Sequence, residues 1–132
     1  MSQDGVEIVR RLFAHWERGD WPASAEHFDP DFETVFGTDS FPDPGHYRGA
    51  RRTLDAWREW LEAWDELRVE LQEVIDAGER VVTLQRLRGR GKGSGADVDR
   101  EVGSIFDFDQ GRIVRMVFCD RDQALEAAGL RE

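Results

Sequence analysis

Asp120 is the carboxylate whose position best suits acid–base chemistry in this sequence. It directly follows an apolar run that reads as the last strand, so its side chain stands where a strand leaves a sheet. Asp120 and Gln123 also have the spacing of a helix capping box, in which side chains bond exposed backbone N–H groups. The residue types therefore leave two roles open for Asp120, a general acid/base and a helix cap.

Metal and thiol chemistry have weaker signals in this sequence. The histidines, His15, His27 and His46, show no metal-ligand spacing, so we expect neither a metal nor a cofactor. The single cysteine, Cys119, excludes an internal disulfide and a cysteine-based zinc site. Its place within a strand predicts a small buried hydrophobe and not a nucleophile.

The charge balance limits the partners of the chain. It has 28 acidic and 18 basic residues, a formal net charge of −10. Such a charge repels phosphate backbones and anionic lipid, so we expect no nucleic-acid or membrane partner. The basic cluster at 86–92 could bind a phosphate or an acidic partner, or could protect an exposed hairpin from edge-to-edge association. No run of 18 apolar residues and no secretory signal is visible, which predicts a cytoplasmic protein.

The hydrophobic pattern predicts one domain with an α+β plan, in which helices come first and hairpin-linked strands follow. Helical spacing covers 5–18, a short second helix follows Trp21-Pro22, and a third begins after Gly49 with Trp57, Trp60 and Trp64 on its apolar stripe. Strands are predicted at 32–36, 65–75, 80–88, 98–108 and 113–119, with a loop at 37–48 and a terminal helix at 120–128. If the sheet curves around the early helices, a pocket forms between them.

Three segments carry a resemblance to a known family. They are Arg18-Gly19-Asp20-Trp21, the turn at 109–115, and the ending at 118–130. Together they resemble the SnoaL-like branch of the NTF2-like superfamily over residues 6–130. The resemblance implies an α+β cone, with three N-terminal helices on a strongly curved, mostly antiparallel sheet and a short C-terminal helix. It also implies a deep pocket and a homodimer packed through the sheet.

The activities of that superfamily can be compared with this chain residue by residue. Ketosteroid isomerases use an aspartate base and an oxyanion hole of tyrosine and aspartate. The matching positions hold Phe36 for the base, and Leu12 and Ser104 for the oxyanion hole. Phenylalanine cannot abstract a proton and leucine cannot donate one, so the isomerase chemistry is not supported. Limonene-type epoxide hydrolases need an aspartate in the last strand, where this chain has Val117. For the acidic group of polyketide cyclases, the nearest carboxylate is Asp120.

The resemblance also implies which side of each strand faces the pocket. It places Arg100 and Ser104 on the inner wall, together with Arg86 and Val117 from neighbouring strands. The charged members, with Glu73, could point into water, form an internal salt-bridge network, or clamp a ligand carboxylate. Trp16 and Trp57 could wall the pocket, although core packing is the ordinary role of such a stripe. The expected ligand-binding residues are Trp16, Phe36, Trp57, Arg86, Arg100, Ser104 and Val117.

Two functions follow from this pattern. The first is a SnoaL-like protein that binds a small apolar or mixed-polarity ligand. If it is an enzyme, Asp120 would serve hydrolysis, isomerisation or cyclisation. The second is a non-enzymatic homodimeric ligand-binding or scaffold module whose aromatic side chains fill the cavity. A catalyst requires a carboxylate inside an open cavity, whereas a scaffold requires a closed core and a broad apolar sheet face.

Overall fold

The computed structural model describes residues 2–20, 26–36, 45–78, 80–93 and 95–129, and it confirms an α+β fold. The helices are α1 (Ser2–Glu17), α2 (Ala50–Glu62) and α3 (Arg121–Ala127). The strands are β1 (Phe28–Phe36), β2 (Gly45–Arg48), β3 (Trp64–Asp76), β4 (Arg80–Gly91), β5 (Asp97–Asp109) and β6 (Arg112–Asp120). Within the described residues, no helix has both the length and the apolar character needed to cross a membrane.

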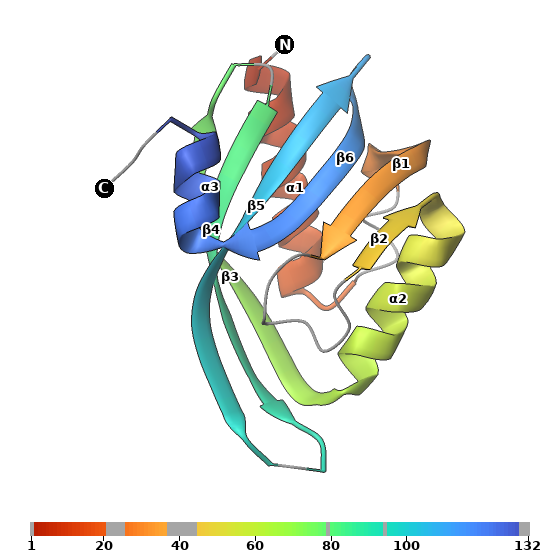
Figure 1. Cartoon of the computed structure of the whole chain (residues 1–132), viewed down its shortest axis with the longest axis vertical. Coiled ribbons are helices and arrows are strands. Elements are labelled where there is room, and N and C mark those ends of the chain that lie inside the picture. Colours follow the sequence, from red (N-terminus) through yellow and green to blue (C-terminus); the bar gives the residue numbers. More distant parts are fainter. Residues whose placement is uncertain (1, 21–25, 37–44, 79, 94, 130–132) are drawn as a thin grey trace.

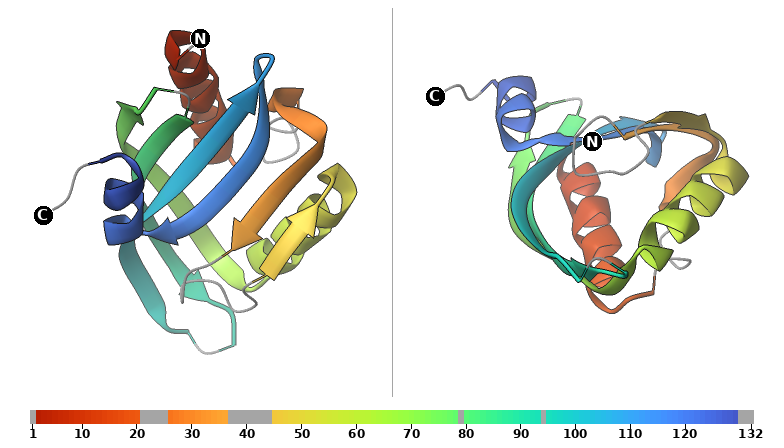
Figure 2. Two further views of the ribbon diagram at one scale, coloured as in Figure 1. Left: turned by 45° about the horizontal axis from the view of Figure 1, so that its top comes forward. Right: turned by 60° about the horizontal axis from the view of Figure 1, so that its bottom comes forward.

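The strands form a six-stranded sheet in the order β2-β1-β6-β5-β4-β3. Only the β1–β6 pair is parallel, and every other neighbouring pair is antiparallel. Figure 1 shows the elements, and Figure 2 shows the sheet curving around α1. We call the side that holds α1 the concave face and the opposite side, which carries α3, the convex face. The expected curvature of the sheet is therefore present.

The described residues do not show the three N-terminal helices that the resemblance implied. One described helix, α1, precedes the sheet, and α2 lies between β2 and β3. Of the short helix expected after Trp21, residues 21–25 lie outside the described part, and Glu26 and His27 form a 3₁₀ turn. Phe28 already begins β1. Pro30 is tolerated there because the β1–β6 ladder is interrupted between Phe28 and Glu33, where a missing N–H costs no ladder bond.

The loop predicted at 37–48 is partly a strand. Residues 45–48 form β2, which pairs with the end of β1, and residues 37–44 lie outside the described part. Trp64 belongs to β3 and not to the preceding helix. The other predicted elements are confirmed to within a few residues at their ends.

Each face of the sheet has its own core. On the concave face a large cluster packs against α1 and α2. Its buried members include Leu12, Phe13, Trp16, Phe28, Phe32, Trp57, Val81, Leu87, Val102, Phe106, Ile113 and Met116. On the convex face a smaller cluster packs under α3. Its buried members are Val82, Leu84, Ile105, Val117, Cys119, Ala124 and Leu125. The middle strands are therefore buried on both faces along part of their length.

Gly103 allows α3 to lie directly on β5. A Cβ atom at this position would lie 2.3 Å from the Ala124 Cβ and 3.0 Å from the Thr83 carbonyl oxygen. Because real carbon atoms do not approach so closely, any larger side chain at this position would push the helix off the strand. The convex core therefore depends on a missing side chain at position 103.

Candidate functional site

Aromatic side chains from both long helices and from β1 meet on the concave face. The rings of Trp16 in α1 and Trp57 in α2 lie 5.6 Å apart in an edge-to-face arrangement. Trp57 also meets Phe28 at 6.0 Å, and Trp16 meets Phe118 of β6 at 6.1 Å. Trp16 is 3% exposed and Trp57 4%. The structure thus brings these two sequence-predicted residues together in one aromatic wall.

Three buried polar side chains lie on the concave side of β4 and β5, and we call Thr83, Gln85 and Ser104 the polar trio. The Thr83 hydroxyl donates to Gln85 Oε1 at 2.8 Å, and Gln85 Nε2 donates to Ser104 Oγ at 2.7 Å. Thr83 and Ser104 are 0% exposed and Gln85 1%. Ser104 shares its face with Val102 and Phe106 of the concave core, as the sequence predicted.

Sequence reasoning missed Thr83 and Gln85. The sequence contains a sign of them, because Thr83 and Gln85 alternate with apolar residues between Val81 and Leu87. Placing Arg86 on the inner wall put Thr83 and Gln85, which alternate with it along the strand, on the opposite face. A second buried hydroxyl pair, Thr53 of α2 and Thr34 of β1, joins helix to sheet with 3.4 Å between the two Oγ1 atoms.

Arg100 and Asp120 lie together where β5 and β6 leave the concave face. Arg100 Nη2 is 4.0 Å from Asp120 Oδ1, and the two side chains are 42% and 61% exposed. Asp120 occupies the N-cap position of α3, but its side chain makes no capping hydrogen bond. Because this carboxylate is exposed and beside an arginine, it lacks the enclosure that acid–base catalysis uses.

Arg86 lies on the convex face, so its assignment to the pocket wall was wrong. Its Nε donates to Asp99 Oδ1 at 2.6 Å and its Nη2 to Asp99 Oδ2 at 2.9 Å. The hydrogen bond from Arg86 holds the pKa of Asp99 below its usual range. Arg88 lies 3.3 Å from Glu70 on the neighbouring strand. Glu70, Arg86, Arg88 and Asp99 form an exposed set that we call the convex charge ladder.

Val117 was also assigned to the wrong face. It packs with Val82, Leu84 and Cys119 in the convex core. Because β4 carries apolar residues on both faces, simple alternation does not reveal which set points inward. The pairing of β5 with β6 also changes register between Asp107 and Phe108 of β5, so alternation cannot be carried from one strand to the other without a shift. Phe36 ends β1 beside Phe118, and its side chain lies outside the described part.

Of the three roles left open for Glu73, the structure agrees with exposure to water, because Glu73 is exposed on the convex side opposite Leu84. Further along the same strands, a surface groove of about 570 Å³ crosses the outer half of β3, β4 and β5. Arg88 and Arg90 in this groove each lie 3.3 Å from a carboxylate, that of Glu70 and of Asp97. The basic hairpin is therefore locally neutralised.

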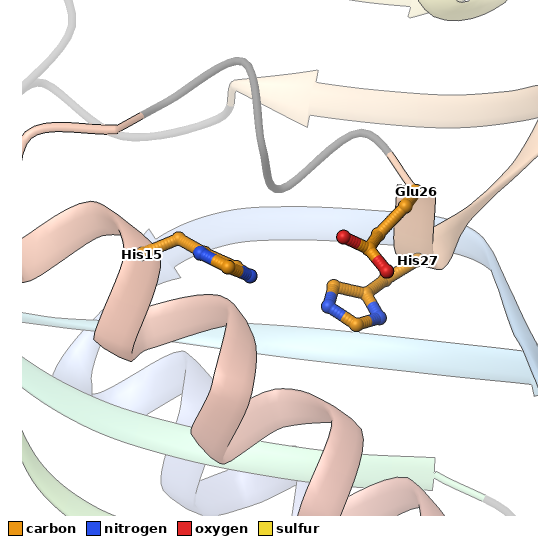
Figure 3. A group of neighbouring side chains, drawn as sticks. All are labelled: His15, Glu26 and His27. Atoms are coloured by element: carbon orange, nitrogen blue, oxygen red, sulfur yellow. The ribbon is translucent and has the colours of Figure 1, made fainter.

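A separate cluster forms from residues that the sequence keeps apart. His15 projects from α1 toward Glu26 and His27 in the turn before β1 (Figure 3). One potential ligand atom from each residue lies within 4.8 Å of the others. Burial lowers the pKa of His27, and the charges of His15 and Arg11 lower it further against the opposing effect of Glu26. Sequence analysis did not predict this group, because His15 lies in α1 whereas Glu26 and His27 lie in the later turn.

Comparison with known proteins gives matches to both the sequence and the fold. The family model of the SnoaL-like domain matches residues 9–116. No curated protein matches the chain. An NTF2-like protein from Burkholderia thailandensis has 25% identity and a TM-score of 0.82, with 95% of this chain and 96% of that chain covered.

Two further solved structures share the fold. A protein from Jannaschia, provisionally assigned as a SnoaL-like polyketide cyclase, has 24% identity and a TM-score of 0.77, with 96% of this chain and 91% of that one covered. Bal32a, from a soil-derived mobile gene cassette, has 18% identity and a TM-score of 0.81, covering 99% and 98%. Since the family model spans most of the chain, this protein belongs to the SnoaL-like domain family, within the NTF2-like fold.

Proposed function

We propose that this protein binds a small, mostly apolar molecule carrying one acceptor oxygen, at the polar trio on the concave face. The observation that carries the proposal is a buried set of neutral polar groups within an otherwise apolar and aromatic wall. Small-molecule sites commonly combine an apolar lining with a few converging hydrogen-bonding groups. Membership of the SnoaL-like family supports the same class of function.

The hydrogen bonds of the polar trio leave capacity for a ligand. Gln85 uses its carbonyl oxygen for one hydroxyl group and its amide nitrogen for the other. The Ser104 hydroxyl accepts the hydrogen bond from the Gln85 amide, so its own proton is available to a ligand acceptor. A ketone or ether oxygen would satisfy that donor. The rings of Trp16 and Trp57 must shift to admit the rest of the molecule, because both are almost fully buried.

The same geometry favours binding over acid–base catalysis. Among the described residues, the buried polar side chains are the polar trio, Thr34 and Thr53, which are all uncharged near neutral pH. Asp120, the carboxylate expected to be catalytic, is exposed beside Arg100. We therefore assign Arg100 and Asp120 to the edge of the site, where they would meet a polar end of the ligand.

A scaffold function is less well supported than ligand binding. It would need a broad apolar sheet face, but the convex charge ladder occupies the outer half of β3–β5 and the small convex core is covered by α3. A nucleic-acid function is disfavoured because the hairpin arginines lie beside carboxylates. A homodimer stays an expectation from the family resemblance, and light scattering of the purified chain tests it.

Calorimetric titration with two matched probes tests the proposal. 1-Tetralone and tetralin have nearly the same shape, but only the ketone offers an acceptor oxygen. We expect the ketone to bind about tenfold more tightly, the worth of one net hydrogen bond. Ser104→Ala should remove most of that preference, and Arg86→Gln on the convex face should leave it unchanged. Equal affinity for both probes, or no binding of either at millimolar concentration, would contradict the proposal.

A further inference from the structure

We propose that His15, Glu26 and His27 bind a first-row divalent transition-metal ion, for which Zn²⁺ is the test ion. Two imidazoles and one carboxylate are donors that such ions prefer, and three protein ligands leave coordination positions open. The three side chains converge from α1 and from the turn before β1, with ligand atoms within 4.8 Å of one another (Figure 3). The ligand proposal uses none of these three residues.

The geometry needs only a small contraction to hold a metal. Zinc bonds of roughly 2.0–2.1 Å place neighbouring ligand atoms about 3.3 Å apart in a tetrahedral site. Glu26 is exposed, so its carboxylate can turn without breaking a packing contact. The two histidine rings are already 5.8 Å apart between centroids and inclined by 31°.

His27 supplies a second and independent observation. Its Nε2 atom is buried and has no hydrogen-bond partner among the described residues. A buried polar atom without a partner costs free energy, and a bound water or ion is one way in which proteins satisfy such an atom. A metal ion between His27 and His15 would use this nitrogen and remove that cost.

Arg18 opposes the metal in a way that makes the site testable. Its Nη2 donates to His15 Nδ1 at 2.8 Å, so a neutral His15 ring carries its proton on Nε2. Metal binding at Nε2 requires that proton to move to Nδ1, and Arg18 must then release the ring. Arg18 is exposed and can do so. It nevertheless opposes metal binding in two ways: it favours the His15 tautomer that is protonated on Nε2, and its positive charge repels the metal ion.

Titration of tag-free, chelator-treated protein with Zn²⁺, and with Co²⁺ as a coloured substitute, tests the site. We expect one ion per chain and a Co²⁺ absorption band typical of nitrogen and oxygen ligands. Loss of an outer-shell partner typically weakens metal binding about 10–100-fold, so Glu26→Gln and His27→Ala, which remove direct ligands, should each weaken it by at least about tenfold. His46→Ala, which removes a histidine elsewhere on the surface, is the matched control and should change nothing.

The Arg18→Gln variant gives the sharpest result, because we expect it to bind Zn²⁺ several-fold more tightly than the natural chain. Circular dichroism of each variant checks that it folds. If a histidine variant does not fold, Glu26→Gln still tests the site. The proposal is overturned if no stoichiometric binding is found. It is equally overturned if Glu26→Gln binds as tightly as the natural chain, or if only His46→Ala reduces binding.

Discussion

The concave and convex faces of the sheet use polar residues in opposite ways. On the concave face, Thr83, Gln85 and Ser104 are uncharged, fully buried and bonded to one another. On the convex face, Arg86 and Asp99 are charged, exposed and paired across the strands. Both sets lie on the same two strands, β4 and β5. Position along the chain therefore says less about the role of a polar side chain than the face on which it lies.

The difference has a physical consequence. An exposed ion pair gains little, because water solvates each partner almost as well as the pair does. A buried polar group gains nothing from water, so each missing bond is costly. Substitutions on the concave face should therefore have large effects on stability and binding, whereas substitutions in the convex charge ladder should have small ones. The predictions below test that contrast, beginning with the largest effect.

Phe106→Ala removes a fully buried ring from the concave core, where it meets Phe13 with 6.3 Å between centroids. We expect the free energy of unfolding to fall by about 3–5 kcal/mol, because both buried area and packing are lost. Urea denaturation measures the change. Phe108→Ala, at a partly buried position two residues later, is the control and should cost less. Equal costs at the two positions would contradict the assigned concave core.

Gly103→Ala tests how closely α3 approaches the convex face. The added carbon would lie 2.3 Å from the Ala124 Cβ, so we expect a loss of about 1–3 kcal/mol in the free energy of unfolding. Adding Ala124→Gly in the same chain should recover part of that loss. A double-mutant cycle in urea measures this coupling. Strictly additive effects would show that α3 does not lie against this position.

Ser104→Ala leaves the Gln85 amide without one of its buried partners. We expect unfolding to become easier by about 1–3 kcal/mol, the cost of an unsatisfied buried group. The double variant Gln85→Leu with Ser104→Ala should cost less than the two single variants added together. If the single variant is as stable as the natural chain, then the polar trio is not a connected buried unit.

The convex core contains a group that responds to pH. Burial, with a smaller contribution from Asp120, raises the pKa of the Cys119 thiol from 9.0 to about 12. Above pH 9 the unfolded chain therefore releases a proton that the folded chain keeps, so the free energy of unfolding falls as pH rises toward 12. Urea midpoints between pH 7 and 10.5 should fall more steeply for the natural chain than for Cys119→Ala. Identical slopes would mean that Cys119 is not buried.

Arg86→Gln should have the smallest effect. Both it and its partner Asp99 are exposed, so we expect no measurable shift in the urea midpoint at physiological salt. The pKa of Asp99 is lowered in the folded chain, so any contribution of this pair is present at neutral pH and is lost as pH falls through that lowered pKa. A clear loss of stability at pH 7 would show that the convex charge ladder contributes more than this comparison assigns to it.

Sequence reasoning located most elements because turns and periodicity are local signals. The strands β3 to β6 and the helix α2 lie close to their predicted ranges, and Trp16, Trp57 and Ser104 lie on the concave face. The faces of Arg86 and Val117 were predicted wrongly, because strands buried on both sides carry no alternation that marks the inside. Register shifts, such as the one opposite Phe108, add to the ambiguity.

The cluster of His15, Glu26 and His27 could not be predicted for a different reason. Its members meet only because the chain folds back after α1, and no spacing rule describes a contact between a helix and a later turn. Asp120 illustrates the converse, since its spacing to Gln123 predicted a cap, whereas its side chain caps nothing. Local patterns predict elements well, but side-chain contacts require the three-dimensional arrangement.

The claim that the concave face receives a small molecule is tested most directly by nuclear magnetic resonance of ¹⁵N-labelled protein titrated with 1-tetralone. We predict that the side-chain amide of Gln85 and the indole signals of Trp16 and Trp57 shift together and saturate at one molecule per chain. Signals of Arg86 and Val117 on the convex face should move least. Shifts confined to the groove at the outer end of β3–β5, or no saturable shift at all, would contradict the account.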